Sequence, residues 1–137
     1  MPSDLITPSA AVWSDVDLKH LRATEDTLLR IAPAGAVISS LRPQWGYLAV
    51  LDLAPDSAID EIRIALEVCA GEVAVMLATR DDSLALYQQC VPAGWHGDVF
   101  LPFGPVEGGT QAVIRSASAD SRPTVVHIES IGLLSAA

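Results

Sequence analysis

Residues 61–68 read Glu61-Ile62-Arg63-Ile64-Ala65-Leu66-Glu67-Val68, the clearest strand pattern in the chain. Its large apolar side chains alternate with charged or small ones, so they share one face of an extended strand. This alternation predicts an antiparallel strand with one face in the core and the other in solvent. The next run, residues 72–79, is also apolar. Ala70-Gly71 between the two runs predicts a tight turn, so we expect the runs to pair as a hairpin.

The same pattern continues along the chain, where Gly, Pro or Asp clusters interrupt the apolar runs about every eight to twelve residues, as in sandwiches and barrels. The further predicted strands are residues 28–31, 36–39, 45–53, 84–90, 98–103, 111–116 and 124–131. Unequal strands and several long connections favour two stacked sheets over a closed barrel. We therefore predict an all-β, two-sheet antiparallel sandwich, jelly-roll-like, with about nine strands.

Half of the 137 residues are apolar, which is enough for one domain to form a core without disulfides or a metal. We expect residues 25–137 to form the sandwich and residues 1–24 to form an irregular N-terminal segment packed on it. Within that segment, residues 16–21 fit a helical turn and an edge strand equally well. The chain ends directly after a strong strand, which indicates a domain taken from a longer polypeptide.

The charge balance restricts the partners. The chain has 17 acidic residues against 8 basic ones and a formal net charge of −9, so phosphate backbones and anionic membranes are poor partners. The N-terminus lacks the pattern of a secretory signal, and no run of about twenty apolar residues follows. We therefore expect a cytoplasmic protein. Cys69 and Cys90 lie in separate apolar runs, which predicts reduced, half-buried thiols.

The sequence contains no recognisable catalytic or metal-binding motif. His20, His96 and His127 are far apart and lack the close spacing of metal ligands. There is no nucleophile elbow of the form Gly-x-Ser-x-Gly. The acidic pair Asp81-Asp82 is typical of a turn, in which short polar side chains bond the local backbone. We therefore predict no catalytic residue, no metal and no cofactor.

The three tryptophans are unusually placed, because all lie at segment edges or in loops. Trp95-His96 lies in a loop bounded by Pro and Gly, and Trp45-Gly46-Tyr47 opens a strand. Either group of rings is suited to stack on the apolar face of a sugar while nearby polar groups bind its hydroxyls. The alternative is that these rings, like that of Trp13, close the ends of the core.

Four strand segments carry a resemblance to known proteins. In order they are Tyr47-Leu48-Ala49-Val50-Leu51-Asp52-Leu53, Ile62-Arg63-Ile64-Ala65-Leu66-Glu67-Val68 with Gly71-Glu72-Val73-Ala74-Val75, Val113-Ile114-Arg115-Ser116-Ala117-Ser118, and Val125-Val126-His127-Ile128-Glu129-Ser130-Ile131. In pattern they resemble galactose-binding-like and carbohydrate-binding-module β-sandwiches. In particular they are similar to accessory domains of bacterial methyltransferases and glycosyltransferases of surface-polysaccharide synthesis.

This resemblance implies a jelly roll that holds a glycan or a sugar-bearing substrate near a catalytic partner. Ligands of such folds bind either to loops at one end or to a concave sheet face. The first arrangement makes Arg80, Trp95 and His96 the candidates, and the second Tyr47 and Arg115. Because Arg115 lies in an apolar strand, its guanidinium either anchors a ligand or pairs with a carboxylate or the backbone at the sandwich rim.

Three hypotheses on function follow from these observations. The first is a non-catalytic carbohydrate-binding module whose site includes Trp45 or Trp95. The second is a structural domain, either a homo-oligomer or attached to a partner enzyme domain, which requires an exposed apolar patch. The third is a small sandwich-fold enzyme acting on sugars, which requires two carboxylates about 5–10 Å apart in a cleft.

Overall fold

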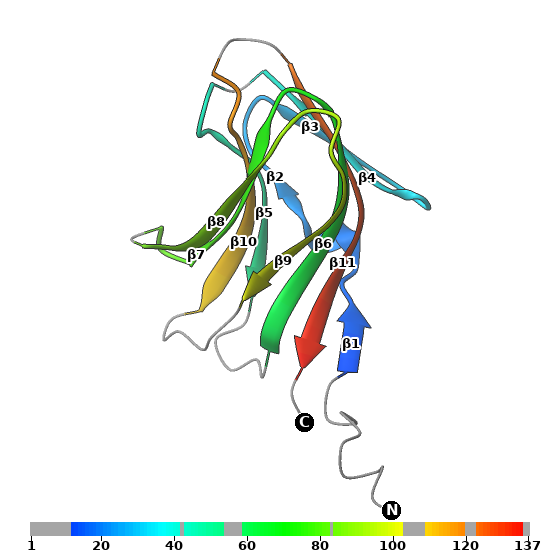
Figure 1. Cartoon of the computed structure of the whole chain (residues 1–137), viewed down its shortest axis with the longest axis vertical. Coiled ribbons are helices and arrows are strands. Elements are labelled where there is room, and N and C mark those ends of the chain that lie inside the picture. Colours follow the sequence, from blue (N-terminus) through cyan, green and yellow to red (C-terminus); the bar gives the residue numbers. More distant parts are fainter. Residues whose placement is uncertain are drawn as a thin grey trace, which may run out of the picture.

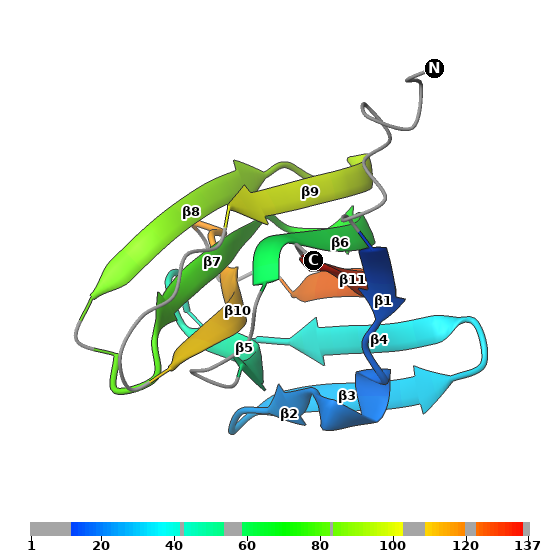
Figure 2. The same ribbon diagram turned by 90° about the horizontal axis from the view of Figure 1, so that it is seen from below.

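Two antiparallel sheets packed face to face make up the fold (Figures 1 and 2). The computed structural model describes residues 12–41, 43–53, 59–82, 84–102, 109–119 and 123–135. These residues form eleven strands and one short 3-10 turn, η2 (Leu18–His20). In the described part of the chain, no helix has the length and apolar character needed to span a membrane.

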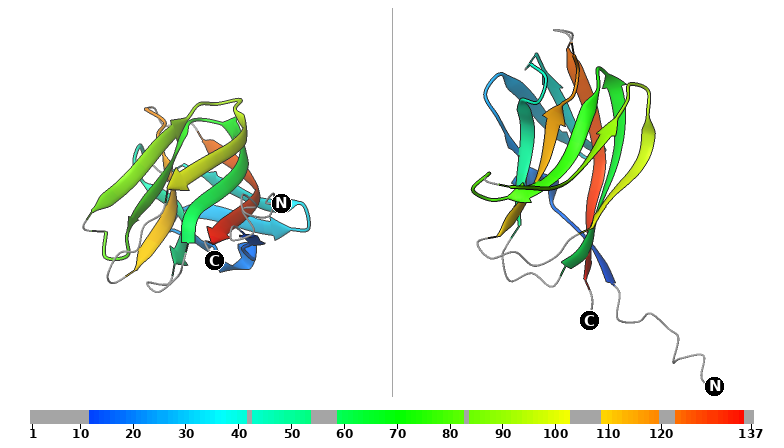
Figure 3. Two further views of the ribbon diagram at one scale, coloured as in Figure 1. Left: turned by 60° about the horizontal axis from the view of Figure 1, so that its bottom comes forward. Right: turned by 60° about the vertical axis from the view of Figure 1, so that its left-hand side comes forward.

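The chain passes repeatedly between the two sheets. Sheet A has the order β3 (Thr27–Ala32), β4 (Gly35–Ser40), β11 (Thr124–Ser135), β6 (Ile59–Ala70) and β9 (His96–Pro102), and β1 (Val12–Asp15) also pairs with β11. Sheet B has the order β2 (Arg22–Ala23), β5 (Tyr47–Leu53), β10 (Thr110–Ser116), β7 (Val73–Thr79) and β8 (Ala85–Val91). Strands β8 and β9 lie side by side along one edge of the sandwich, and β2 and β3 along the other (Figures 2 and 3).

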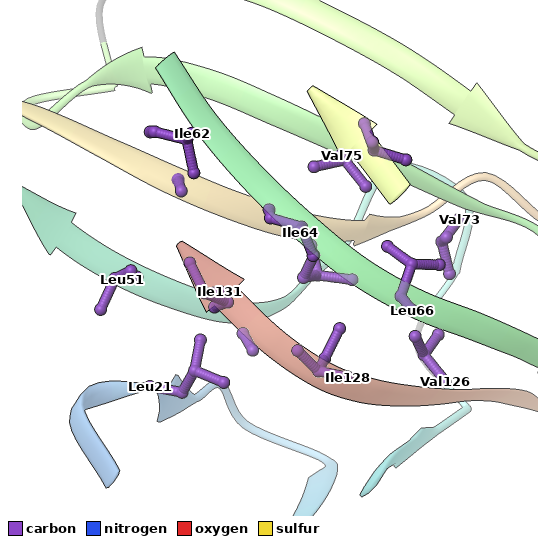
Figure 4. Close-up of a cluster of buried hydrophobic side chains, with 14 of the residues drawn as sticks. Leu21, Leu51, Ile62, Ile64, Leu66, Val73, Val75, Val126, Ile128 and Ile131 are labelled. Carbon is purple, nitrogen blue, oxygen red and sulfur yellow. The ribbon is translucent and has the colours of Figure 1, made fainter. Parts of the chain in front are cut away.

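The core lies between the sheets and is built from the strand alternation that the sequence shows. In β6, the side chains of Ile62, Ile64 and Leu66 are at most 1% exposed. They meet side chains of β7 and β11 in one apolar cluster, including Val75 and Ile128 (Figure 4). Burial of side chains of this size stabilises the fold by about 1.5–3 kcal/mol each.

The expected hairpin of residues 61–68 and 72–79 is wrong. Strand β6 pairs with β11 and β9, whereas β7 pairs with β10 and β8, so the turn between them crosses from one sheet to the other. At this crossing Gly71 has φ +73°, and a Cβ there would lie 2.7 Å from the Ser118 hydroxyl oxygen. Both strands direct their apolar faces into the same core. A tight turn fits this arrangement as well as it fits a hairpin.

All nine expected strands occur, and the two additional ones lie in the first two dozen residues. Of the segment expected to be irregular, residues 1–11 lie outside the described residues, while 12–24 contain β1, η2 and β2. Strands of four and two residues are too short to produce a readable period. The expected last residue of β9, Phe103, also lies outside the described residues. Cys69 and Cys90 are free and lie on different sheets, but both are exposed, so the expectation of half-buried thiols is wrong.

Candidate functional site

The outer face of sheet B, directed away from the core, carries a second buried apolar cluster. Since Leu51, Leu77 and Ile114 point into the core, their neighbours along the strands point outward. The outward side chains of Val50, Met76, Ala78 and Val113 are nevertheless only 0–5% exposed and form a cluster of their own, against which Tyr47 packs. The described strands form two sheets and no third layer above this face, and the face is nevertheless closely packed.

The strand register arranges this face in rows. The central row crosses all five strands as Gln88, Met76, Val113, Val50 and Arg22. On one side of it lies Arg115, opposite Tyr47 and Ala74, and on the other side lies Gln111, opposite Asp52 and Ala78. Long polar side chains thus surround short apolar ones.

A turn before β5 brings Trp45 onto this face. The backbone N–H of Trp45 donates to the Ser116 carbonyl at 2.7 Å, and the N–H of Ser116 donates back to the Gly46 carbonyl at 2.8 Å. Trp45 has φ +71°, a left-handed conformation that costs a non-glycine residue about 1–2 kcal/mol. Strain of this kind persists only where the surrounding contacts enforce it, and it is concentrated at functional sites.

The guanidinium of Arg115 lies between two aromatic rings. Its Cζ is 5.1 Å from the centre of the Trp45 ring and 5.4 Å from that of Tyr47. Its Nε and Nη2 donate to the Trp45 carbonyl at 3.2 and 3.0 Å, and Nη1 lies 3.3 Å from both Gln88 Oε1 and Met76 Sδ. Among the described residues, no carboxylate forms an ion pair with this guanidinium. We call Trp45, Tyr47, Gln88 and Arg115 the sheet B platform.

The side chain of Tyr47 extends along the face toward the opposite row. Its hydroxyl donates to Asp82 Oδ1 at 3.0 Å, and Gln111 Nε2 donates to the same oxygen. Burial raises the pKa of the Tyr47 phenol above its ordinary value, the hydrogen bond and charge of Asp82 raise this pKa further, and Arg115 opposes them. The phenol therefore stays protonated at neutral pH, with its ring held against the apolar cluster.

Of the sequence-predicted site residues, the fold brings Trp45, Tyr47 and Arg115 together and places the others elsewhere. Trp95 is half-buried and packs against the end of the core, as in the alternative considered for it. His96 belongs to β9 on the other sheet and binds Glu129, with 2.9 Å between Nε2 and Oε1. The Glu129 contact raises the pKa of His96 above its ordinary value.

Arg80 lies at the end of β7, where its side chain extends along Gly109. Its backbone N–H donates to the Gly109 carbonyl at 3.2 Å. It thus approaches the Gln111 end of the face, but no contact joins it to Trp45, Tyr47 or Arg115. Its assignment to the site stays a prediction, as do those of Trp95 and His96.

Sequence reasoning missed the polar residues that complete the face, which are Asp82, Gln88 and Gln111. Gln111 was visible as the first polar residue of a strand whose partners on the same face are Val113 and Arg115. Gln88 gave no such signal in the sequence. In the structure its strand has exposed side chains at every position from Ala85 to Cys90, so no buried face marks Gln88 as special. Asp82 was assigned to turn chemistry. It does occupy a turn, with φ +63°, and it also binds Tyr47.

A hollow of about 640 Å³ lies elsewhere, at the end of the sandwich near β1 and η2. Three carboxylates line it, those of Asp15, Asp17 and Asp52. Asp17 accepts the Lys19 backbone N–H at 3.0 Å, and Asp52 binds Arg22 at 3.0 Å. Two of the three carboxylates thus have structural partners. This makes the hollow a weaker candidate than the sheet B platform.

Comparisons with known proteins give a fold and no family. No protein-family model matches the sequence, and no curated protein matches it either. The structure is similar to solved carbohydrate-binding modules. One is a xylan-binding module, CBM15, with a TM-score of 0.63 at 14% identity over 90% of this chain and 96% of that one.

Two further similar structures come from named organisms. A family 29 carbohydrate-binding module from Piromyces equi gives a TM-score of 0.58 at 11% identity, over 92% of this chain and 91% of that one. The CBM6-3 module from Clostridium stercorarium, in complex with cellobiose, gives 0.57 at 12% identity, over 90% and 94%. At these identities the likeness establishes the β-sandwich fold, which confirms the fold class expected from the sequence.

Proposed function

We propose that this chain is a non-catalytic carbohydrate-binding module and that the sheet B platform holds a sugar. The observation that carries the proposal is the placement of the Arg115 guanidinium between the rings of Trp45 and Tyr47. Trp45 is 42% exposed and so keeps indole surface available to a ligand. Apolar sugar faces stack on such rings, while Gln88 and Arg115 supply hydrogen-bonding groups beside them.

The platform is organised before a ligand arrives. Arg115 is fixed by the Trp45 carbonyl and by Gln88, and Tyr47 is fixed by Asp82. Side chains that are already held lose little conformational entropy on binding, which favours affinity. The closely packed Val50, Met76 and Val113 support the Tyr47 ring from the sheet side.

The ligand in this proposal is a neutral glycan. A net charge of −9 opposes a polyanionic chain, and the site itself offers one guanidinium and one carboxylate, those of Arg115 and Asp82. The xylan-binding and cellobiose-bound modules of similar fold support the choice of xylan and cellulose oligosaccharides for a first screen.

The wider context belongs to the same proposal. The chain acts in the bacterial cytoplasm as an accessory domain of an enzyme of surface-polysaccharide synthesis, where it keeps a glycan close to a catalytic partner. The sequence resemblance to such accessory domains supports this context. Co-purification of the module with a methyltransferase or glycosyltransferase domain tests it, and a module found only outside the cell contradicts it.

The direct test is isothermal titration calorimetry with xylan, cellulose and mannan oligosaccharides, followed by thermal unfolding with the best ligand. At a ligand concentration about 100 times Kd, we expect the folded state to gain about 2.7 kcal/mol. The variant Trp45→Ala should lose the part of the heat of binding and of the thermal shift that the sheet B platform contributes. Arg115→Gln should weaken binding, because it removes the charge and part of the hydrogen-bonding capacity.

Leu28→Ala is the matched control, since Leu28 is 76% exposed on β3 of the other sheet. It should bind as the unaltered protein does. Trp95→Phe tests the alternative loop site at the core end. Loss of binding in Trp95→Phe with full binding in Trp45→Ala would move the site to that loop and overturn the sheet B assignment.

Self-association through β8 is a second candidate function, favoured by one observation. Residues 84–91 contain no charged side chain, and Leu84, Leu86 and Tyr87 are 58%, 37% and 39% exposed. Among the described strands β8 is hydrogen-bonded to β7 alone, so no strand is paired with its other edge. Light scattering after gel filtration should then show a dimer that Leu86→Lys dissociates, and a monomer at all concentrations would rule this out.

A further inference from the structure

A second aromatic pair lies on the outer face of sheet A, on the opposite side of the sandwich from the sheet B platform. Trp13 of β1 and Phe100 of β9 have ring centres 6.4 Å apart at an angle of 58°. Trp13 is 39% exposed and Phe100 43%. The Cζ of Arg63, from β6, is 5.1 Å from the centre of the Trp13 ring. We call Trp13, Arg63 and Phe100 the sheet A platform.

The strand register and one glycine create this arrangement. Arg63 lies directly opposite Phe100 on β9 and opposite Gly132 on β11. A Cβ at Gly132 would lie 3.1 Å from Arg63 Nη2 and 3.3 Å from Trp13 Cε3. The missing side chain therefore gives the indole and the guanidinium room to lie close to the backbone. A glycine inside a strand commonly marks such a close approach.

One polar group beside these rings has no partner among the described residues. The Nε of Arg63 is buried and has no hydrogen-bond partner, and within the described residues no carboxylate forms an ion pair with this guanidinium. Asp15 lies opposite Gly132, and Asp98 lies two residues before Phe100 on the same face of β9. Hydrogen-bond donors and acceptors thus both lie near the rings.

A sugar fits this surface better than a second protein chain does. With about two fifths of its surface exposed, each of the two aromatic side chains presents roughly 60–100 Å² to solvent. A standard protein interface buries approximately 800 Å² on each partner. The composition also repeats that of the sheet B platform, with an indole 5.1 Å from a guanidinium and a second aromatic ring beside it.

We propose that the sheet A platform is a second sugar-binding site. This inference rests on the proposed function, which it extends from one site to two. Because the platforms lie on the two outer faces of the sandwich, one straight glycan segment does not reach both. The module therefore binds two glycan segments and cross-links separate polysaccharide chains. A polysaccharide with many binding sites then holds the module with greater avidity than one site gives.

The test is calorimetric stoichiometry with the best short oligosaccharide on the full chain, together with light scattering of the protein mixed with the parent polysaccharide. We expect two ligands per chain for the unaltered protein and one for each of Trp13→Ala and Trp45→Ala. Scattering from cross-linked polysaccharide should disappear in both variants. Phe100→Ser is an independent variant, since it leaves β1 unchanged, and circular dichroism verifies folding throughout.

The outcomes separate this inference from the proposed function. One ligand per chain, lost in Trp45→Ala and kept in Trp13→Ala and Phe100→Ser, overturns the second site and leaves the proposed function intact. Binding that depends on Trp13 and not on Trp45 supports the sheet A platform and overturns the sheet B assignment. No binding to any glycan overturns both. A dimer that Phe100→Ser dissociates assigns the platform to a second copy of the chain and overturns the inference.

Discussion

The two outer faces of the sandwich use the same side-chain types and support them differently. On sheet B, Tyr47 packs on a buried apolar cluster, and the Arg115 guanidinium beside it donates hydrogen bonds to the Trp45 carbonyl. On sheet A, Trp13 and Arg63 lie over Gly132, and the Arg63 Nε has no partner. The distance from guanidinium to indole is 5.1 Å in both cases.

The difference shows that a contact distance alone does not define a site. The sheet B platform is held by its own packing and hydrogen bonds, and its tryptophan has a left-handed backbone. The sheet A platform depends on the absence of one side chain, and its tryptophan lies in an ordinary short strand. We therefore expect the first platform to be rigid and the second to adjust more readily to a ligand.

The largest expected effect compares one outward position on each sheet. Val113 is 0% exposed on the outer face of sheet B, whereas Ala65 is only half-buried on the outer face of sheet A. Val113→Gln should lower the free energy of unfolding by about 2–4 kcal/mol, because it buries an amide and removes an apolar side chain. Ala65→Gln should cost less than about 1 kcal/mol.

Urea denaturation of both variants measures these two free energies. The comparison requires that the slopes of the two transitions agree with that of the unaltered protein. Equal losses of stability in the two variants would mean that sheet B has no specially packed outer face. The closely packed cluster that is proposed to hold the sheet B platform in place would then be absent.

An intermediate effect distinguishes the two tryptophans by their backbones. At Trp45, with φ +71°, glycine relieves the strain that alanine keeps, so Trp45→Gly should be more stable than Trp45→Ala by about 1 kcal/mol. At Trp13, in β1, the order reverses, since glycine in a strand is less stable than alanine by roughly 0.5–1 kcal/mol. Thermal unfolding of the four variants gives both differences, and the same sign at both positions would contradict the strain assigned to Trp45.

The smallest effect concerns pH and the outer face of sheet A. The hydrogen bond and charge of Glu129 raise the pKa of His96 above 6.5, with smaller contributions from Glu67 and Asp98. Because the pKa is higher in the folded state, this contact stabilises the protein below about pH 6.5. The stabilisation is lost as the pH rises through the folded-state pKa.

Melting temperatures between pH 5.5 and 8.5 test this contact in the unaltered protein and in Glu129→Gln. The unaltered protein should lose more stability toward high pH than the variant does. His96→Gln should behave like Glu129→Gln, because either change removes the interaction. Parallel pH profiles in all three proteins would show that the exposed pair contributes nothing to stability.

Much of the fold was readable from the sequence, because a period of two assigns each side chain to one of two faces. The alternation in residues 61–68 predicted the buried face of β6, and the Ile62, Ile64 and Leu66 side chains are indeed in the core. The same rule does not say which strand lies beside which. The predicted hairpin of 61–68 with 72–79 failed for this reason, since β7 faces β6 across the core.

The candidate site was predictable only in part. Trp45, Tyr47 and Arg115 were among the predicted residues, but Trp95 and His96 were grouped with them because all the aromatic candidates lie at segment edges. Trp13 was not among the predicted site residues, and Phe100 was passed over as the outward residue of a strand. An aromatic side chain on the polar side of an alternating strand was the available signal for Phe100.

Local alternation and turn residues were enough to predict the all-β class, the two-sheet architecture and the inward face of most strands. Which distant residues meet depends on the folded arrangement of the strands. Arg115 reaches Trp45 because β10 lies next to β5, and Arg63 reaches Trp13 because β11 lies between β6 and β1. Strand pairing depends on the packing of the whole core, so no short stretch of sequence encodes either platform.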